Sequence, residues 1–395
     1  MALKKRRPES RFMIKVRSSK YGIYIFYLSV FLALLLFAGA VYFYIYPYIK
    51  SHIKKEDPII YNEFVEAVDE SDKSDEPEIE DLSAKQQDVR TIRSTCNDPY
   101  FNNSEMVFSS GIMSKGVFRY KELFIYYSET EETQQITNIN IEHDNIINCL
   151  ITDDYLVYID SCEAGGGRIL GYNRRTDEQF LVKEYLYSAP RISIDGNLIA
   201  FMQQTGDHTD KLYVFDLENR EGLCLKTFKS ESRFPSSAYI FDGRVVCSVT
   251  STSGDEVKSS IYLFNLAAGS SKEIEVSGDV YYPCSNGRYT VYLSNMQPYG
   301  GELWIANSNG KSEKLKDNVV NCFIGNGFVA YTQDETIFAY VFETGKTYRI
   351  SSSLTRGVLA SVSGNEICWY DITSGFGDMD LVKHLTTSFG TNGEE

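Results

Sequence analysis

The feature that most constrains the fold is a repeat of about 40 residues that begins beyond Asn97. Each copy opens with a turn, usually of Asp-Gly or Asn-Gly type, and continues as a run rich in β-branched and aromatic residues. The clear copies are DDYLVYID from 153, DGNLIAFM from 195, DGRVVCSV from 242, NGRYTVYL from 286 and NGFVAYTQ from 326, and the weaker ones are KELFIYYS from 121 and GNEICWYD from 364. A period of this length is typical of propeller blades.

The remainder of each clear copy contains a second hairpin. KLYVFDLENREGLCL (211–225) and IYLFNLAAGSSKEIEV (261–276) show its form of strand, short polar turn and strand. Four strands in about 40 residues make one blade, and closing the blades into a ring removes exposed sheet edges. The sequence therefore predicts an all-β fold, a β-propeller over residues 96–386, followed by a polar tail at 387–395. Seven blades fit the copies best, and six or eight stay open because the first copy is poor.

The repeats resemble those of TolB-like and related bacterial β-propeller proteins, in which a DG turn and strand are followed by LYxxDxxxG. The closest copy is KLYVFDLENREG at 211–222, and the resemblance extends over about residues 91–385. Propellers of unrelated function share this degenerate motif, so it indicates the fold more than an activity. The resemblance implies an interaction module of the periplasm or cell envelope.

Upstream of the repeats, residues 21–49 carry no charge, and the core of this stretch is LSVFLALLLFAGAVYF at 28–43. About 20 apolar residues are enough to cross a bilayer. Residues 1–20 carry a net charge of +7. The positive-inside bias then predicts a single-pass transmembrane helix in the cell membrane, with a basic cytoplasmic tail and an extracytoplasmic propeller. Ala38-Gly39-Ala40 resembles a signal-peptide cleavage site, but the apolar run continues beyond it, which favours an uncleaved signal-anchor.

Residues 50–95 are expected to form an acidic linker between the anchor and the propeller. Over residues 50–90 the net charge is −7, and the segment SDKSDEPEIED at 71–81 has almost no apolar residues with which to pack. Like charges along such a segment repel one another and extend it. We interpret the linker as a spacer that holds the propeller away from the membrane.

Motifs for catalysis and metal binding are missing from the sequence. No G-x-S-x-G, H-E-x-x-H or P-loop string occurs, and the eight cysteines include no C-x-x-C pair. Most cysteines lie in β-rich runs and are expected in the core, with Cys96 and Cys162 the freer ones, and their disulfide state stays open. We therefore expect no cofactor and no enzyme activity. The alternative is a cell-wall glycan- or peptide-active enzyme with carboxylates in the propeller funnel.

The loops between the second and third strands of each blade should all emerge on one face. They are EAGGGR (163–168), TGDHTD (205–210), TSGDEVKSS (252–260), NMQPYGGE (295–302) and TSGFGDMD (373–380). Function concentrates on loops held by a rigid scaffold, so this face is the candidate binding surface, although merely soluble turns are the simpler interpretation. Its candidate residues are Asp207, Asp210, Asp255, Glu256, Tyr299, Glu302, Phe376, Asp378 and Asp380, and a candidate calcium site combines Asp371, Asp378 and Asp380.

The charge balance bears on the class of partner. The chain has 39 Lys and Arg residues against 54 Asp and Glu, a net charge of −15. An acidic chain lacks the basic surface that phosphate neutralisation requires, so nucleic acid is not an expected partner. The anchor, the spacer and the ring of repeats together predict a membrane-anchored, extracytoplasmic protein-binding module, a scaffold or sensor. Its expected partner is another protein of the cell envelope.

Overall fold

A computed structural model describes residues 79–82, 90–93, 96–114, 117–206, 209–229, 237–253, 256–307, 311–373, 381–387 and 389. These residues form strands and turns, and none of them lies in a helix. A search of the same residues for a helix long and apolar enough to cross a membrane finds none. The expected transmembrane segment 21–49 and the basic tail 1–20 lie outside them.

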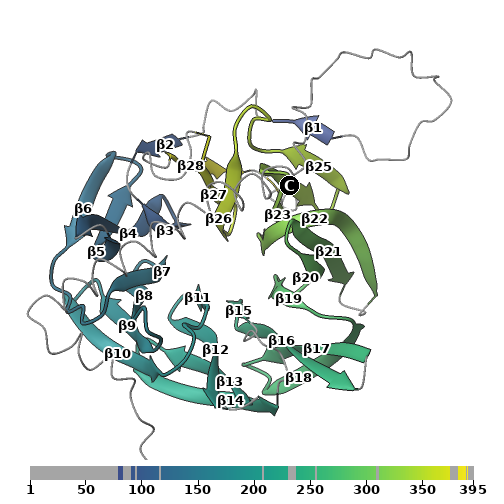
Figure 1. The fold of residues 1–395 in the computed structure, drawn as a ribbon, viewed down its shortest axis with the longest axis horizontal. Helices are drawn as coiled ribbons and strands as arrows, with labels where there is room; N and C mark the ends of the chain where they lie inside the picture. Colours follow the sequence, from purple (N-terminus) through teal and green to yellow (C-terminus); the bar gives the residue numbers. More distant parts are fainter. Residues whose placement is uncertain are drawn as a thin grey trace, which may run out of the picture. The chain divides into compact units, whose positions relative to one another are not determined.

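Four sheets hold four consecutive antiparallel strands each, and Figure 1 shows them following one another around an open centre. The first two sheets contain β3 (Asn97–Asn102), β4 (Glu105–Ser114), β5 (Val117–Tyr127) and β6 (Glu132–Ile136), then β7 (Asn145–Ile151), β8 (Tyr155–Ser161), β9 (Gly167–Asn173) and β10 (Glu178–Tyr185). The next two contain β11 (Ile192–Asp195), β12 (Leu198–Gly206), β13 (Thr209–Asp216) and β14 (Glu221–Lys229), then β15 (Ala238–Phe241), β16 (Arg244–Ser253), β17 (Glu256–Asn265) and β18 (Ser270–Ser277). The all-β propeller fold predicted from the repeats is confirmed.

The next sheet has eight strands, because one long strand belongs to two four-stranded groups. Its strands are β19 (Tyr281–Ser285), β20 (Tyr289–Gln297), β21 (Gly300–Asn307), β22 (Ser312–Ile324), β23 (Phe328–Gln333), β24 (Thr336–Val341), β25 (Lys346–Arg349) and β1 (Ile79–Asp81). The first part of β22 pairs with β21 and its last part with β23, and β1 adds to β25 in parallel. The register of β22 shifts beside Asn318, whose φ of 58° lies in the left-handed region.

The last sheet joins the two ends of the chain. Its strands are β26 (Gly357–Ser363), β27 (Glu366–Asp371), β28 (Leu381–Thr386) and β2 (Arg90–Arg93), in that order. Arg90 pairs with His384 and Arg93 with Leu381, so an N-terminal strand completes the C-terminal sheet. Strands therefore begin at Ile79, within the stretch 50–95 that was expected to be linker, and the expected boundary at residue 96 lies too late. β1 and β2 are short edge strands without the alternating pattern that identifies a strand in sequence.

Six of the seven repeat copies mark the second strand of a four-stranded group, and the first copy does not. KELFIYYS from 121 lies in β5, the third strand of its sheet. The true equivalent is the turn Asn103-Ser104 before β4, with φ of 47° and 70°. The same left-handed geometry occurs at Asp242-Gly243, with φ of 46° and 63°, as two-residue hairpins require. The first turn contains no glycine, and the DG/NG pattern therefore missed it.

Apolar side chains fill the space between neighbouring sheets. Phe180 of β10 lies in one cluster with Phe201 of β12 and Phe215 of β13, which joins the second sheet to the third. The aromatic residue in the middle of several second strands is fully buried, as Tyr158, Tyr292 and Tyr331 show. Burial of a large apolar side chain stabilises the fold by roughly 1.5–3 kcal/mol. The packing between sheets therefore fixes the position of each sheet in the ring.

The innermost strands of neighbouring sheets run in the same direction, as the side-chain contacts between their matching ends show. Asn97 and Asn103, at the two ends of β3, contact Ile146 and Asp153 at the two ends of β7. Consecutive strands are antiparallel, so the second-to-third connections and the connections to the next sheet share one face. We call this the loop face; its described parts include residues 162–166, 186–191, 298–299, 333–336 and 350–356. The opposite turn face carries tight turns such as 103–104, 196–197 and 242–243.

Candidate functional site

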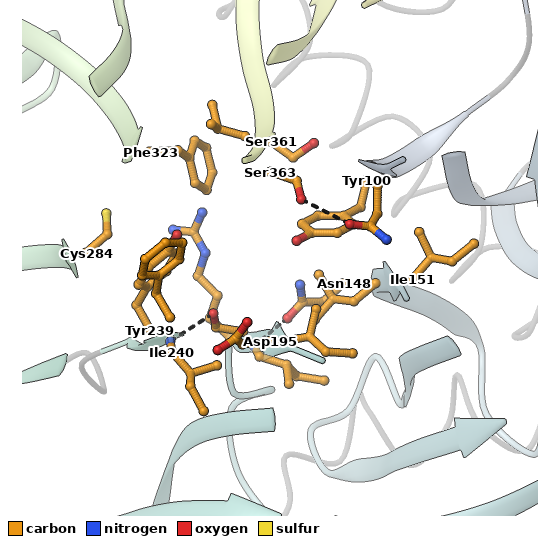
Figure 2. Close-up of a pocket in the computed structure, with 18 of the residues that line it drawn as sticks. Tyr100, Asn148, Ile151, Asp195, Tyr239, Ile240, Cys284, Phe323, Ser361 and Ser363 are labelled. Carbon is orange, nitrogen blue, oxygen red and sulfur yellow. Dashed lines mark hydrogen bonds between the residues drawn. The ribbon is translucent and has the colours of Figure 1, made fainter. Parts of the chain in front are cut away.

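A cavity of about 1000 Å³ lies inside the ring of innermost strands (Figure 2). Each four-stranded group contributes residues from its first strand, namely β3, β7, β11, β15, β19, the last part of β22, and β26. A cavity of this size is at the upper end of the range for small-molecule sites. Figure 2 shows Tyr100, Asp195, Tyr239, Phe323 and Ser363 around the open centre.

Backbone bulges shape the wall of the cavity. The registers of β3, β7 and β19 shift at Asp98, Asn148 and Tyr282, and these residues have φ of 48°, 51° and 50°. A bulge leaves one residue unpaired and redirects its side chain. The Asn148 N–H donates to Asp98 Oδ2 at 2.7 Å, and the Ile192 N–H donates to Asn148 Oδ1 at 2.6 Å. The bulged side chains therefore link consecutive sheets around the cavity.

The cavity contains three carboxylates, and each accepts a hydrogen bond from the backbone of a neighbouring sheet. Besides Asp98, Asp195 accepts from the Gly243 N–H at 3.2 Å and Glu366 from the Ser104 N–H at 3.4 Å. Withdrawal from bulk water raises the pKa of Asp98, against the opposing effects of the Asn148 N–H and the Arg191 charge. All three carboxylates therefore act as links between sheets.

Aromatic rings and one cation make up much of the remaining wall. The Arg191 guanidinium lies 4.7 Å from the ring centre of Phe323 and 5.1 Å from that of Tyr282. Tyr239 donates its hydroxyl to the Ile324 carbonyl at 3.4 Å. Burial raises the pKa of both Tyr100 and Tyr239, so both phenols stay neutral at physiological pH. The wall thus combines apolar and polar surface.

Two thiols on adjacent inner strands also line the cavity, those of Cys284 and Cys322. A hydrogen bond with Cys322 lowers the pKa of Cys284, whereas the same contact and burial raise that of Cys322. All eight cysteines are free. Cys96 is buried, contrary to the expectation that it would be among the freer ones, while Cys162 is half-buried and Cys224 is exposed.

The structure describes four of the predicted binding residues at least in part. Tyr299 is 86% exposed at the β20–β21 turn, as a contact residue would be. Glu302 instead accepts hydrogen bonds from Asn295 and Trp304 at 3.0 Å, and Asp210 is buried on β13. Glu256 begins β17, with its side chain outside the described residues, and Asp207, Asp255, Phe376, Asp378 and Asp380 lie wholly outside them.

The candidate calcium site is represented by Asp371 alone. This side chain is buried at the end of β27, where it accepts hydrogen bonds from the Thr373 N–H at 3.1 Å and from the Thr373 hydroxyl. Among the described residues, no three His, Cys, Asp or Glu side chains gather as a metal site would require. The calcium site stays a prediction.

The second-to-third loops are shorter than the sequence suggested. β12 continues to Gly206 and β13 begins at Thr209, while β16 pairs as far as Ser253 with Glu256. Thr, Ser and Val residues at these hairpin ends keep the strands paired. The polar stretches expected as loops are therefore largely strand ends.

The loop face nevertheless exposes large apolar side chains. Leu186 is 80% exposed, Tyr299 86% and Leu354 88%, and Tyr187 beside Leu186 is 47% exposed. The Gly166 N–H donates to the Tyr187 carbonyl at 2.9 Å, which holds this connection against the β8–β9 loop. In the described tight turns of the turn face, no large apolar side chain is exposed. The two faces therefore differ in surface chemistry.

A polar cluster stands beneath this part of the loop face. The side chain of Asp160, at the end of β8, is 0% exposed and accepts hydrogen bonds from Arg168 Nη2 at 2.6 Å and from the Glu142 and His143 N–H groups at 3.0 Å. His143 Nδ1 lies 3.1 Å from Asp160 Oδ2, and Arg168 also pairs with the exposed Glu142. The cluster anchors the connection before β7 to the second sheet.

Several solved structures are similar to this chain. The β-propeller domain of the trilobed protease from Pyrococcus furiosus, described as having an open velcro topology, aligns with a TM-score of 0.56 and 11% identity, over 76% of this chain and 98% of that one. An acylaminoacyl peptidase from Pyrococcus horikoshii gives a TM-score of 0.52 and 14% identity, over 70% of this chain and 49% of the peptidase. A prolyl endopeptidase gives 0.52 and 11%, over 75% of this chain and 47% of that enzyme.

These likenesses support the β-propeller fold and nothing finer. This chain spans about half the length of the two peptidases. No family model matches the chain, and no curated protein matches it in sequence. The likeness to TolB-like proteins therefore stays a resemblance of repeats.

Proposed function

We propose that the propeller is a protein-binding module and that its loop face is the contact surface. The observation that carries the proposal is the exposure of Leu186, Tyr299 and Leu354 on connections of that face. Apolar side chains cost free energy in water, and aromatic anchors dominate protein interfaces. The described tight turns of the opposite face offer no such anchor.

The proposal includes the placement that the sequence predicts. Residues 21–49 anchor the chain in the cell membrane with residues 1–20 in the cytoplasm, and the propeller acts as an extracytoplasmic scaffold or sensor for another envelope protein. We count the eight-stranded sheet as two blades that share β22, which gives seven blades in all, with β2 as the outer strand of the last. The TolB-like resemblance is consistent with this role.

Site-specific photocrosslinking in intact membranes tests the proposal. Benzoylphenylalanine replaces Tyr299 or Leu354 in the full-length protein, and the matched control replaces Leu223, which is 63% exposed on the outer strand β14. We expect the same crosslinked partner from the first two positions and none from Leu223. The proposal fails if the loop-face positions give no partner, or if Leu223 gives the same one.

The alternative is a glycan- or peptide-active enzyme, and one observation favours it: the central cavity is large and contains three carboxylates. Two of them, Asp195 and Glu366, lie at the ends of strands near the turn face. Asp195→Asn and Glu366→Gln variants should have unaltered partner capture under the binding proposal. Hydrolysis of cell-wall fragments that disappears in either variant, with folding intact, would establish the enzyme.

A further inference from the structure

The Arg191 guanidinium lies at the wall of the central cavity. It lies over the rings of Tyr282 and Phe323, at 5.1 and 4.7 Å, and its charge acts on Asp98, Cys284 and Cys322, but within the described part of the chain it has neither an ion pair within 4.0 Å nor a hydrogen bond. A guanidinium carries five donors, and in protein interiors such donors are normally satisfied. Arg191 is half-buried. The N–H donors of Arg191 are therefore available to a ligand at the wall of the cavity.

The surroundings hold the side chain in place but leave its donors open. The nearby carboxylate of Asp98 accepts a hydrogen bond from the Asn148 N–H at 2.7 Å and forms no ion pair with Arg191 within 4.0 Å. Contact with two rings restricts the motion of the guanidinium, which reduces the entropy lost when a ligand binds. This geometry is that of a pre-organised anion-binding group.

The other lining residues restrict the ligand to one class. The charged groups of the cavity are Arg191 and the carboxylates of Asp98, Asp195 and Glu366, so a multiply charged anion would meet strong repulsion. A singly charged carboxylate suits the planar fork of a guanidinium. The rings of Tyr239 and Phe323 offer apolar contact beside it.

We propose that the central cavity binds a monocarboxylate attached to an apolar or aromatic group, with Arg191 as the anchor of the carboxylate. Such a group occurs in free small acids and at the C-terminal residue of a peptide. Arg191 ends the loop-face connection 186–191 but lines the central cavity, and binding of the acid does not depend on a protein partner.

Titration calorimetry with the full-length protein tests the site. The probes are N-acetylphenylalanine and a tetrapeptide ending in phenylalanine with a free carboxylate, each compared with its C-terminal amide. We expect at least one acid to bind about tenfold more tightly than its amide, the preference typical of a charge-assisted contact. A response to the peptide alone would identify a chain end as the source, and a response to the small acid would identify free acids.

Two variants separate the anchor from a general effect on the fold. Arg191→Met keeps the apolar stem and should abolish the preference for acid over amide. The matched control is Arg288→Met, because Arg288 also lies over a ring, that of Tyr289 at 5.3 Å, but does not line the cavity. The proposal is overturned if neither acid binds, if acid and amide bind equally, or if Arg191→Met retains the preference while its thermal unfolding matches that of Arg288→Met.

Discussion

Replacing Asp160 by asparagine tests whether the buried polar cluster stabilises the fold. The carboxylate is fully buried and receives three hydrogen bonds, one from the Arg168 guanidinium and two from backbone N–H groups. The asparagine amide retains the shape of the carboxylate, but it carries no charge. Its NH₂ group would face hydrogen-bond donors that now point at a carboxylate oxygen. Arg168 is only 15% exposed and would lose its buried counter-ion.

Removing one partner of a buried ion pair costs about 3–5 kcal/mol, and the lower end applies here because the exposed Glu142 still pairs with Arg168. The matched control is Glu142→Gln, because Glu142 pairs with the same guanidinium at 2.6 Å but is 55% exposed. An exposed pair contributes at most about 1 kcal/mol. Equilibrium urea unfolding of both variants measures the difference. A loss for Asp160→Asn no greater than that for Glu142→Gln would refute the reasoning.

The pH dependence of the same variant gives a second check. Burial raises the pKa of Asp160, but the hydrogen bonds from Arg168 and from the backbone of Glu142 and His143 outweigh it, so the pKa is lowered overall. A carboxyl whose pKa is lower in the folded state stabilises the protein above its unfolded pKa of about 3.9. The wild-type advantage over Asp160→Asn should therefore be complete at neutral pH and shrink as the pH falls below about 4.

Two further predictions concern ring closure and thiol reactivity. Ser361→Ala removes the buried hydrogen bond from Ser361 Oγ to the Pro99 carbonyl, at 3.1 Å, between the last sheet and the first, and should lower the free energy of unfolding by about 1 kcal/mol. Ser363→Ala removes a longer and weaker contact with Asn102, at 3.5 Å, at the same junction, so it should lower the free energy of unfolding by less. A larger loss for Ser363→Ala than for Ser361→Ala would contradict this account. In timed alkylation of the folded protein followed by mass spectrometry, exposed Cys224 should react first and half-buried Cys162 next, because the reagent can reach only accessible thiols. Cys247 and Cys368, whose pKa values burial raises, should react last, and early modification of either would show that the buried thiols are accessible.

The repeat predicted much of the ring because hairpin turns have local chemical requirements. Asp242-Gly243 adopts a turn that needs left-handed backbone at both residues, and this requirement is visible in the sequence. Asn103-Ser104 adopts the same geometry without glycine and was missed. β1 and β2 were missed for another reason. Their partners lie more than 250 residues away, and an edge strand of three or four residues carries no periodic signal of its own.

The cavity residues could not be identified from the sequence, although their positions are regular. Asp98, Asn148 and Tyr282 occupy bulges near the start of inner strands, and Arg191 directly precedes one. A residue type that differs in every copy leaves no motif, and nothing local distinguishes a strand that faces a cavity from one that faces a neighbouring sheet. The loop position of Tyr299 was recognisable because a Pro-Tyr-Gly turn is a local signal, and Tyr299 is exposed there, whereas its role in binding stays a prediction.

The pairing of β2 with β28 determines when the ring can close during synthesis of the chain. Residues 90–93 leave the ribosome nearly 300 residues before their partner at 381–386. Until that partner arrives, β2 cannot join β27 and β26 in the last sheet, and it has an open edge to which another strand can add. The ring can therefore close only when synthesis is almost complete. Chains that end before residue 381 should be the form of this protein most prone to aggregate, even though each of their earlier sheets has all its strands.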